Sequence, residues 1–146
     1  MGGEFLVLPV RGGELAQGGN WVYAWLERSA GFAVVYVGAT GLAPATRMWL
    51  HLHDADPDVG RMAARFERLP DAELDVLAMR VPDEISRADV RDVVGVRLEE
   101  EGLLAPDAIL DHLQPLVDPP PECVELAERF VARVRTYAEQ GGAPLL

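Results

Sequence analysis

Residues 21–53 constrain the fold most, because they predict two adjacent strands and a helix in one continuous run. The first strand is expected at Trp21–Glu27 and the second at Phe32–Gly38, since both are rich in the β-branched and aromatic residues that strands favour. Gly31 ends the short connection between them and can take the left-handed conformation that such a hairpin requires. Pro44 suits the first turn of the helix that follows. This run therefore predicts an antiparallel β-hairpin followed by an α-helix.

The helix after Pro44 has two distinct faces. Arg47 and His51 are four residues apart, so they lie on one face of the helix. That face lies outside an apolar stripe that is expected to turn toward the core. The stripe is formed by Ala45, Met48, Trp49 and Leu52. Taken alone, Arg47 and His51 also fit a solvent-facing helix surface, paired with Asp54.

The rest of the first 102 residues predicts two more helices and a third strand. Their expected bounds are Val59–Leu69 for a helix, Glu73–Val81 for the strand, and Ser86 to Glu101 for a helix that Ser86 caps and Gly102 ends. Glu4–Val10 is expected to be a short strand at an edge of the sheet, followed by a flexible, glycine-rich connector over residues 11–20. The expected fold class is α/β of the α+β kind, with a small, mostly antiparallel sheet of three to four strands flanked by helices.

The C-terminal part of the chain predicts a connector and one further helix. Residues 103–121 are rich in proline and are expected to hold a short helical piece at Pro106–Leu113. Residues 122–140 have the spacing of an amphipathic helix. Its apolar face is formed by Val124, Ala127, Phe130, Val131, Val134 and Ala138. The helix is expected to pack on the domain, and a contact with a protein partner or with a second copy is the alternative.

Length and composition predict one cytoplasmic domain with a small extension. The domain is expected over residues 1–102, with its core at 21–102, and the appended segment over 103–146. No apolar run approaches the roughly 20 residues that a membrane helix needs, so no membrane contact is expected. The single Cys123 excludes an internal disulfide and fits a reducing cytoplasm.

The charge of the chain disfavours nucleic acid as a partner without excluding it. The formal net charge is −11, and the chain has no lysine. Proteins that bind nucleic acid usually present a basic face, because neutralising phosphates supplies much of their affinity. One locally basic segment exists, and it contains Arg47, Arg61, Arg65 and Arg68. A local patch of this kind can act despite a negative total charge.

Two strand motifs and a helical pair resemble the GIY-YIG nuclease domain, a family that includes homing endonucleases and the incision subunit of nucleotide excision repair. The motifs are Trp21-Val22-Tyr23 and Tyr36-Val37-Gly38, and Arg47 and His51 follow them with the family's spacing to each other. The first motif keeps the tyrosine and has Trp21 in place of the family's glycine. The resemblance covers residues 21–102. It implies a metal-dependent endonuclease, which is a hydrolase of phosphodiester bonds in nucleic acid.

The resemblance implies a role for each of these residues. Tyr23 and Tyr36 would line the cleft, and one of them would orient or deprotonate the attacking water. Arg47 would contact the phosphate, which its planar guanidinium suits, and Gly38 would lie beside the substrate. His51 would accept or relay a proton, because the ordinary pKa of imidazole is near neutral. The structural alternative for the tyrosines is simple cross-strand packing.

Asp92 is the metal ligand that the resemblance implies. In the family a glutamate on the helix after the third strand holds the divalent metal, and Asp92 stands at the position that resembles it. It would bind Mg²⁺ or Mn²⁺ through oxygen, with Asp89 and Glu99 on the same side of the helix as substitutes. The alternative is that Asp92 is one carboxylate on a solvated helix face. His53 and His112 have no accompanying ligand cluster and are expected to be surface or core histidines.

The departures from the family pattern leave other functions open. Trp21 in the first motif, Asp92 in place of glutamate and the acidic charge favour a catalytically weakened or inactive module that binds protein or nucleic acid. The four retained tyrosine, arginine and histidine side chains favour the enzyme. A third interpretation is an interaction protein whose hairpin resembles the family by chance. In that case the site residues would not converge on one surface.

Overall fold

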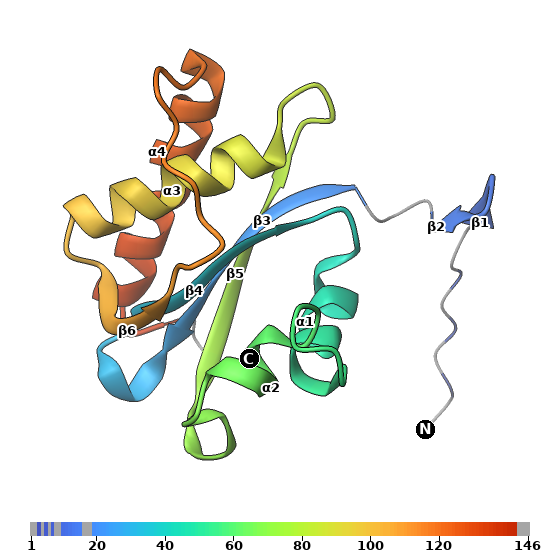
Figure 1. The fold of residues 1–146 in the computed structure, drawn as a ribbon, viewed down its shortest axis with the longest axis horizontal. Helices are drawn as coiled ribbons and strands as arrows, with labels where there is room; N and C mark the ends of the chain where they lie inside the picture. Colours follow the sequence, from blue (N-terminus) through green and yellow to red (C-terminus); the bar gives the residue numbers. More distant parts are fainter. Residues whose placement is uncertain (1–2, 4, 6, 8–9, 16–18, 143–146) are drawn as a thin grey trace.

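The centre of the fold is a mixed sheet of four strands. The computed structural model describes residues 3, 5, 7, 10–15 and 19–142. The strands are β3 (Asn20–Glu27), β4 (Ala33–Thr40), β5 (Leu74–Val81) and β6 (Leu104–Ile109), in the spatial order β5-β3-β4-β6 (Figure 1). Strand β3 pairs antiparallel with β4 and β5, and β6 pairs parallel with β4. The expected α+β class with a mostly antiparallel sheet is confirmed.

Helices cover both faces of this sheet (Figure 1). The helices α1 (Pro44–His53) and α2 (Arg61–Arg65) lie on one face, and α3 (Arg87–Glu100) and α4 (Pro121–Glu139) lie on the other. The 3-10 turns η1 (Arg28–Ala30) and η2 (Leu69–Asp71) each precede a strand of the sheet. A separate small hairpin consists of β1 (Val10–Arg11) and β2 (Glu14–Leu15). None of the helices in the described part of the chain is long and apolar enough to cross a membrane.

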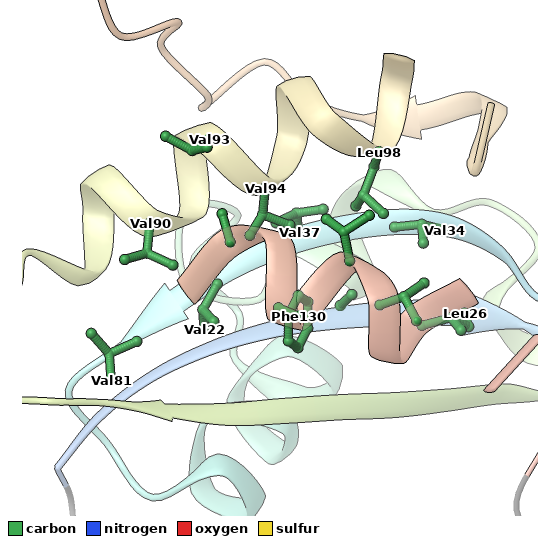
Figure 2. Packing of buried hydrophobic residues seen from close by; sticks show 14 of the residues in the cluster. Val22, Leu26, Val34, Val37, Val81, Val90, Val93, Val94, Leu98 and Phe130 are labelled. Carbon is green, nitrogen blue, oxygen red and sulfur yellow. The ribbon is translucent and has the colours of Figure 1, made fainter. Parts of the chain in front are cut away.

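The larger apolar core lies between the sheet and α3 and α4 (Figure 2). Val22, Ala24 and Leu26 of β3 point into it, because alternate residues of a strand face the same side. Each large aliphatic side chain buried in this way contributes about 1.5–3 kcal/mol to stability. The helical side of the core is formed by Val90, Val93, Val94 and Leu98 of α3 and by Phe130, Val131 and Val134 of α4.

The predicted C-terminal helix is present as α4, shifted by one residue at each end. Its apolar face is buried against α3 and the sheet. The buried residues are Cys123, Ala127, Phe130, Val131, Val134 and Tyr137. Because this face is already covered by the chain itself, a partner or a second copy that binds through α4 would contact its polar face.

The connection between β3 and β4 has two successive residues in the left-handed region. Gly31 has φ of 65°, as the sequence predicts, and Phe32 has φ of 61°. The left-handed backbone of a bulky residue such as Phe32 costs about 1–3 kcal/mol of conformational strain. Because Phe32 does not have the extended backbone of a strand, β4 begins at Ala33. The Phe32 ring is held edge-on to Tyr137 at 5.6 Å and under the guanidinium of Arg28 at 5.2 Å. These contacts offset part of the backbone strain.

The helical piece predicted at Pro106–Leu113 is wrong, because this segment begins as strand β6. Leu104 pairs with Val34 and Ile109 with Tyr36 along the outer edge of β4. The backbone groups of that edge need partners, and this long-range demand has no local signature in the sequence. Pro106 is tolerated because β6 is itself an edge strand, where a missing N–H leaves no gap in the sheet.

Two other expected elements are shorter in the structure. The helix predicted at Val59–Leu69 is reduced to α2, because Phe66 leaves helical geometry and buries its side chain in the smaller core beside Met62. The strand predicted at Glu4–Val10 falls largely outside the described residues, and Val10 belongs to β1. The predicted connector over residues 11–20 contains the turn of the small hairpin and the first residue of β3.

Candidate active site

Tyr23 and Tyr36 lie next to each other on the face of the sheet that α1 and α2 cover. Their ring centroids are 6.1 Å apart, and their ring planes are inclined by 21°. Tyr23 is paired in register with Gly38, and Trp25 with Tyr36, which places these side chains on one face. Both tyrosines are at most 2% exposed. The structure therefore brings together the two tyrosines that the sequence singles out, in a buried position.

Gly38 has a steric role in this arrangement. A Cβ atom at this position would lie 2.5 Å from Cζ and Oη of Tyr23. Real Cβ atoms do not approach other atoms so closely, so only glycine lets the Tyr23 ring lie across β4. Contact between Gly38 and a substrate stays a prediction.

His51 joins the tyrosines from α1. Its side chain is fully buried, and Nε2 lies 2.6 Å from Oη of Tyr23. The imidazole ring meets Tyr36 edge-on at a centroid distance of 4.8 Å, and Trp25 at 5.5 Å. His51 thus contacts both tyrosines, although they come from different strands.

Of the predicted apolar stripe of α1 only Met48 packs toward the sheet, and the expected orientation is wrong for Ala45, Trp49 and Leu52. Trp49 is 59% exposed and Leu52 is 37% exposed, whereas His51 is fully buried. On this face His51 meets three aromatic rings, two of which carry hydroxyl groups. The buried His51 forms a hydrogen bond with the Tyr23 hydroxyl. Without His51 this buried hydroxyl would lose that hydrogen bond. Apolar periodicity alone cannot show such a preference.

This orientation predicts unequal effects for two tryptophans. Trp49→Ala is expected to change the free energy of unfolding by less than about 1 kcal/mol, because the side chain is mostly in solvent. The control Trp25→Ala removes a side chain that is 3% exposed and is expected to cost about 3–5 kcal/mol. Urea denaturation measures both. Equal losses would indicate that α1 buries its apolar stripe.

Arg47 lies beside the tyrosines and is tied to the loop that follows α1. Its Nη1 donates a hydrogen bond of 2.8 Å to the carbonyl oxygen of Val59. Its positive charge acts on Tyr23, Tyr36 and His51, and lowers the pKa that each would otherwise have. Arg47 therefore belongs to the same cluster as the other three predicted residues.

The environment of the cluster fixes the protonation of its members. Burial raises the pKa of Tyr23 above its ordinary value, and the neighbouring Tyr36 adds to this effect. Burial also raises the pKa of Tyr36. Burial lowers the pKa of His51 to about 3, and the charges of Arg47 and Arg61 act in the same direction. At neutral pH the tyrosines are protonated and His51 is neutral, so the Tyr23 hydroxyl can donate to Nε2 of His51.

Asp92 is buried, so the alternative that it is one carboxylate on a solvated face of α3 is wrong. The residue is 6% exposed, and Nε of Arg91 lies 3.0 Å from its Oδ1. It lines a small hollow between α3 and the chain after β6, together with Gly95 and Leu113. The chain after β6 therefore covers the part of α3 that carries Asp92. Arg91 connects this region with the tyrosines, because its charge also acts on Tyr36.

In this arrangement Asp92 and the described residues around it do not form a binding site for a divalent metal ion. The carboxylate already has a guanidinium partner, which competes with a cation. Among the residues that the structure describes, no group of three or more histidine, cysteine, aspartate or glutamate side chains could hold a metal. Glu99 lines the same hollow, but its side chain is exposed. Asp89 lies in the first turn of the helix, where its backbone N–H donates a hydrogen bond to Oγ of the capping residue Ser86. A Mg²⁺ or Mn²⁺ ion at Asp92 stays a prediction.

Two residues that the sequence did not assign to the site lie in the cluster. His112 stacks on Tyr36 with a centroid distance of 4.8 Å and an angle of 13° between the rings. Its Nε2 lies 2.6 Å from the carbonyl oxygen of Val37. The charge of Arg61, the first residue of α2, acts on Tyr36 and on both histidines. Because β6 was not predicted, nothing in the sequence placed His112 beside β4.

Comparison with known proteins adds no relative to this description. Neither a protein-family model, nor a curated protein, nor a solved structure matches this chain. The interpretation of the cluster therefore depends on its geometry and on the motif resemblance.

Proposed function

We propose that this chain is a divergent GIY-YIG-type endonuclease that hydrolyses phosphodiester bonds in nucleic acid. The observation that supports this most is the hydrogen bond of 2.6 Å between Tyr23 Oη and His51 Nε2. It joins a strand residue and a helix residue of the motif, 28 positions apart, in one hydrogen-bonded pair. Tyr36 and Arg47 lie beside this pair.

Each residue has a chemical task in this proposal. The Tyr23 hydroxyl donates its hydrogen bond to the neutral imidazole of His51, which leaves a lone pair on the Tyr23 oxygen to accept a hydrogen bond from the attacking water and orient it. Arg47 neutralises charge on the phosphate, and Tyr36 orients the water from the adjacent strand. The neighbouring Arg61 and Arg91 add positive charge around Tyr36. They give an acidic protein a local site for an anion.

The first experiment is cleavage of supercoiled plasmid, branched DNA and single-stranded DNA at low salt with Mg²⁺ or Mn²⁺. Wild type is expected to cleave, and Arg47→Ala is expected to be slower by about 100-fold or more, because a phosphate contact is lost. Arg129→Ala is the control, since this arginine is exposed on α4. Absence of cleavage by wild type, or equal rates for Arg47→Ala and Arg129→Ala, would contradict the proposal.

Two variants at Asp92 test the metal in the same assay. If Asp92 holds Mg²⁺ or Mn²⁺, Asp92→Asn loses cleavage and Asp92→Glu, which restores the longer carboxylate of the family, retains or gains it. If Asp92 only pairs with Arg91, Asp92→Asn keeps the wild-type rate and the metal dependence. That result would remove Asp92 from the site.

The second candidate function is a GIY-YIG-like module that binds protein or nucleic acid without cleavage. The burial of Tyr23, Tyr36 and His51 favours it, because a substrate would have to displace part of their cover. Fluorescence anisotropy with labelled DNA in EDTA separates the two functions. Binding that Arg47→Ala weakens, in the absence of any cleavage with metal, would support the module and contradict the endonuclease.

A further inference from the structure

Four buried side-chain nitrogen atoms in the described part of the chain find no hydrogen-bond partner there. They are Trp25 Nε1, His51 Nδ1, Arg61 Nη1 and His112 Nδ1. All four belong to the face of the sheet that carries the tyrosines, since the ring contacts and charges described above connect each of them with Tyr36 or His51. A buried polar group without a partner costs about 1–3 kcal/mol. Several such groups around one ring indicate that a polar ligand belongs there.

The hydrogen bonds of His112 determine which of its nitrogens is free. The carbonyl oxygen of Val37 only accepts hydrogen bonds, so Nε2 of His112, 2.6 Å away, carries a proton. In the neutral ring Nδ1 then has a lone pair, and it points to no partner among the described residues. Asp111 is the nearest carboxylate, at 3.8 Å, which is too long for a hydrogen bond. Arg61 Nη1 is by contrast always a donor.

We propose that Arg61 and His112 contact the phosphate group in the site, and that phosphate binding places a proton on Nδ1 of His112. This inference rests on the proposed function in that it concerns the same anion and the same cluster. It adds two residues from outside the motif, one from α2 and one from the chain after β6. With that proton, His112 presents a second cationic donor beside the Arg61 guanidinium. The two donors then share the charge of the phosphate next to Tyr36.

The charges that face His112 explain why it takes up this proton from the solvent only when the anion is bound. Burial lowers the pKa of His112, and Arg61 and Arg91 act in the same direction. The Val37 carbonyl and Asp111 oppose this effect without cancelling it. Its ring neighbour Tyr36 is protonated and uncharged. The free protein therefore has a neutral His112 at neutral pH, and a bound anion raises its pKa.

A dependence of affinity on pH follows from this coupling. Binding takes up a proton wherever the pH lies between the pKa of His112 in the free protein and its higher pKa in the complex. In this window the affinity for a phosphate of constant charge increases by up to about tenfold for each unit by which the pH falls. Below the pKa of the free protein the affinity becomes constant.

The test uses thymidylyl-thymidine, a dinucleotide whose single phosphodiester stays singly charged from about pH 5 to about pH 8. Its affinity is measured by NMR titration in EDTA for wild type, Arg61→Gln and His112→Gln. Both variants are expected to bind about 10- to 100-fold more weakly. His112→Gln is also expected to lose the increase of affinity at low pH. The controls are His53→Gln and Arg129→Gln, because both residues are exposed.

A second measurement uses wild type alone and does not depend on the folding of a variant. In the free protein, nitrogen-15 spectra of the imidazole rings are expected to show His112 protonated on Nε2 only. After the dinucleotide is added, they are expected to show a proton on both ring nitrogens. Failure of wild type to bind, wild-type affinity in His112→Gln, or an unprotonated Nδ1 in the complex would each overturn the inference. Binding without any DNA cleavage would leave it intact while contradicting the endonuclease. DNA cleavage by wild type, together with wild-type affinity in Arg61→Gln and His112→Gln, would support the endonuclease and overturn this inference.

Discussion

Tyr23→Phe is expected to lower the rate of DNA cleavage by about 10²- to 10⁴-fold, because the group that positions the attacking water is lost. The substitution removes only the hydroxyl that lies 2.6 Å from His51 Nε2. The ring would still lie across Gly38 and beside Tyr36, so the packing of the cluster is preserved. Single-turnover cleavage rates, compared with the free energy of unfolding, separate the chemical effect from any loss of fold.

The matched control for this prediction is Tyr137→Phe. Tyr137 also has a partly buried hydroxyl, which donates to Asp75, but its ring belongs to the core on the α4 side of the sheet. This variant is expected to lose stability and to retain the wild-type cleavage rate. A wild-type rate in Tyr23→Phe, or equal loss of rate in both variants, would show that the Tyr23 hydroxyl has no part in the chemistry.

Gly38→Ala is expected to destabilise the protein by about 1–3 kcal/mol and to abolish cleavage. The new methyl group would lie 2.5 Å from Cζ and Oη of Tyr23, so the ring would have to leave its place over β4. Movement of the ring breaks the hydrogen bond to His51 as well. Urea denaturation and the cleavage assay measure the two effects on one sample.

Gly95→Ala is the comparison for Gly38→Ala. A Cβ atom at Gly95 would meet the Cδ1 atom of Leu113, also at 2.5 Å. This contact is with the end of a flexible side chain, whereas Tyr23 is held by a buried cluster. Gly95→Ala is therefore expected to cost less stability and to retain cleavage. A larger loss in Gly95→Ala than in Gly38→Ala would contradict the steric role of Gly38.

The parts of the fold that the sequence predicts well are determined by short-range chemistry. Gly31 marks the hairpin because its φ of 65° is accessible to glycine. Pro44 opens α1, and Ser86 accepts a hydrogen bond of 3.2 Å from the N–H of Asp89 at the start of α3. In each case one residue and its immediate neighbours decide the local structure.

The parts that it does not predict depend on contacts between distant segments. Residues 104–109 form a strand because the edge of β4 needs a partner, although their own pattern indicates no strand. His51 faces the sheet in place of Trp49 because a tyrosine hydroxyl from another element requires it. Asp92 is buried because the chain after β6 crosses α3 at Gly95. The candidate site was found from motif order, whereas the neighbours of His112 and Asp92 required the tertiary structure.

The most direct test of the central claim is a double-mutant cycle on the cleavage rate, with wild type, Tyr23→Phe, His51→Gln and the double variant. If Tyr23 and His51 act as one hydrogen-bonded pair, each single variant loses about the same activity as the double variant, because either change breaks the same unit. Effects that multiply in the double variant would mean that the two residues act independently. That result, or an inactive wild type, would contradict a catalytic role for the 2.6 Å hydrogen bond.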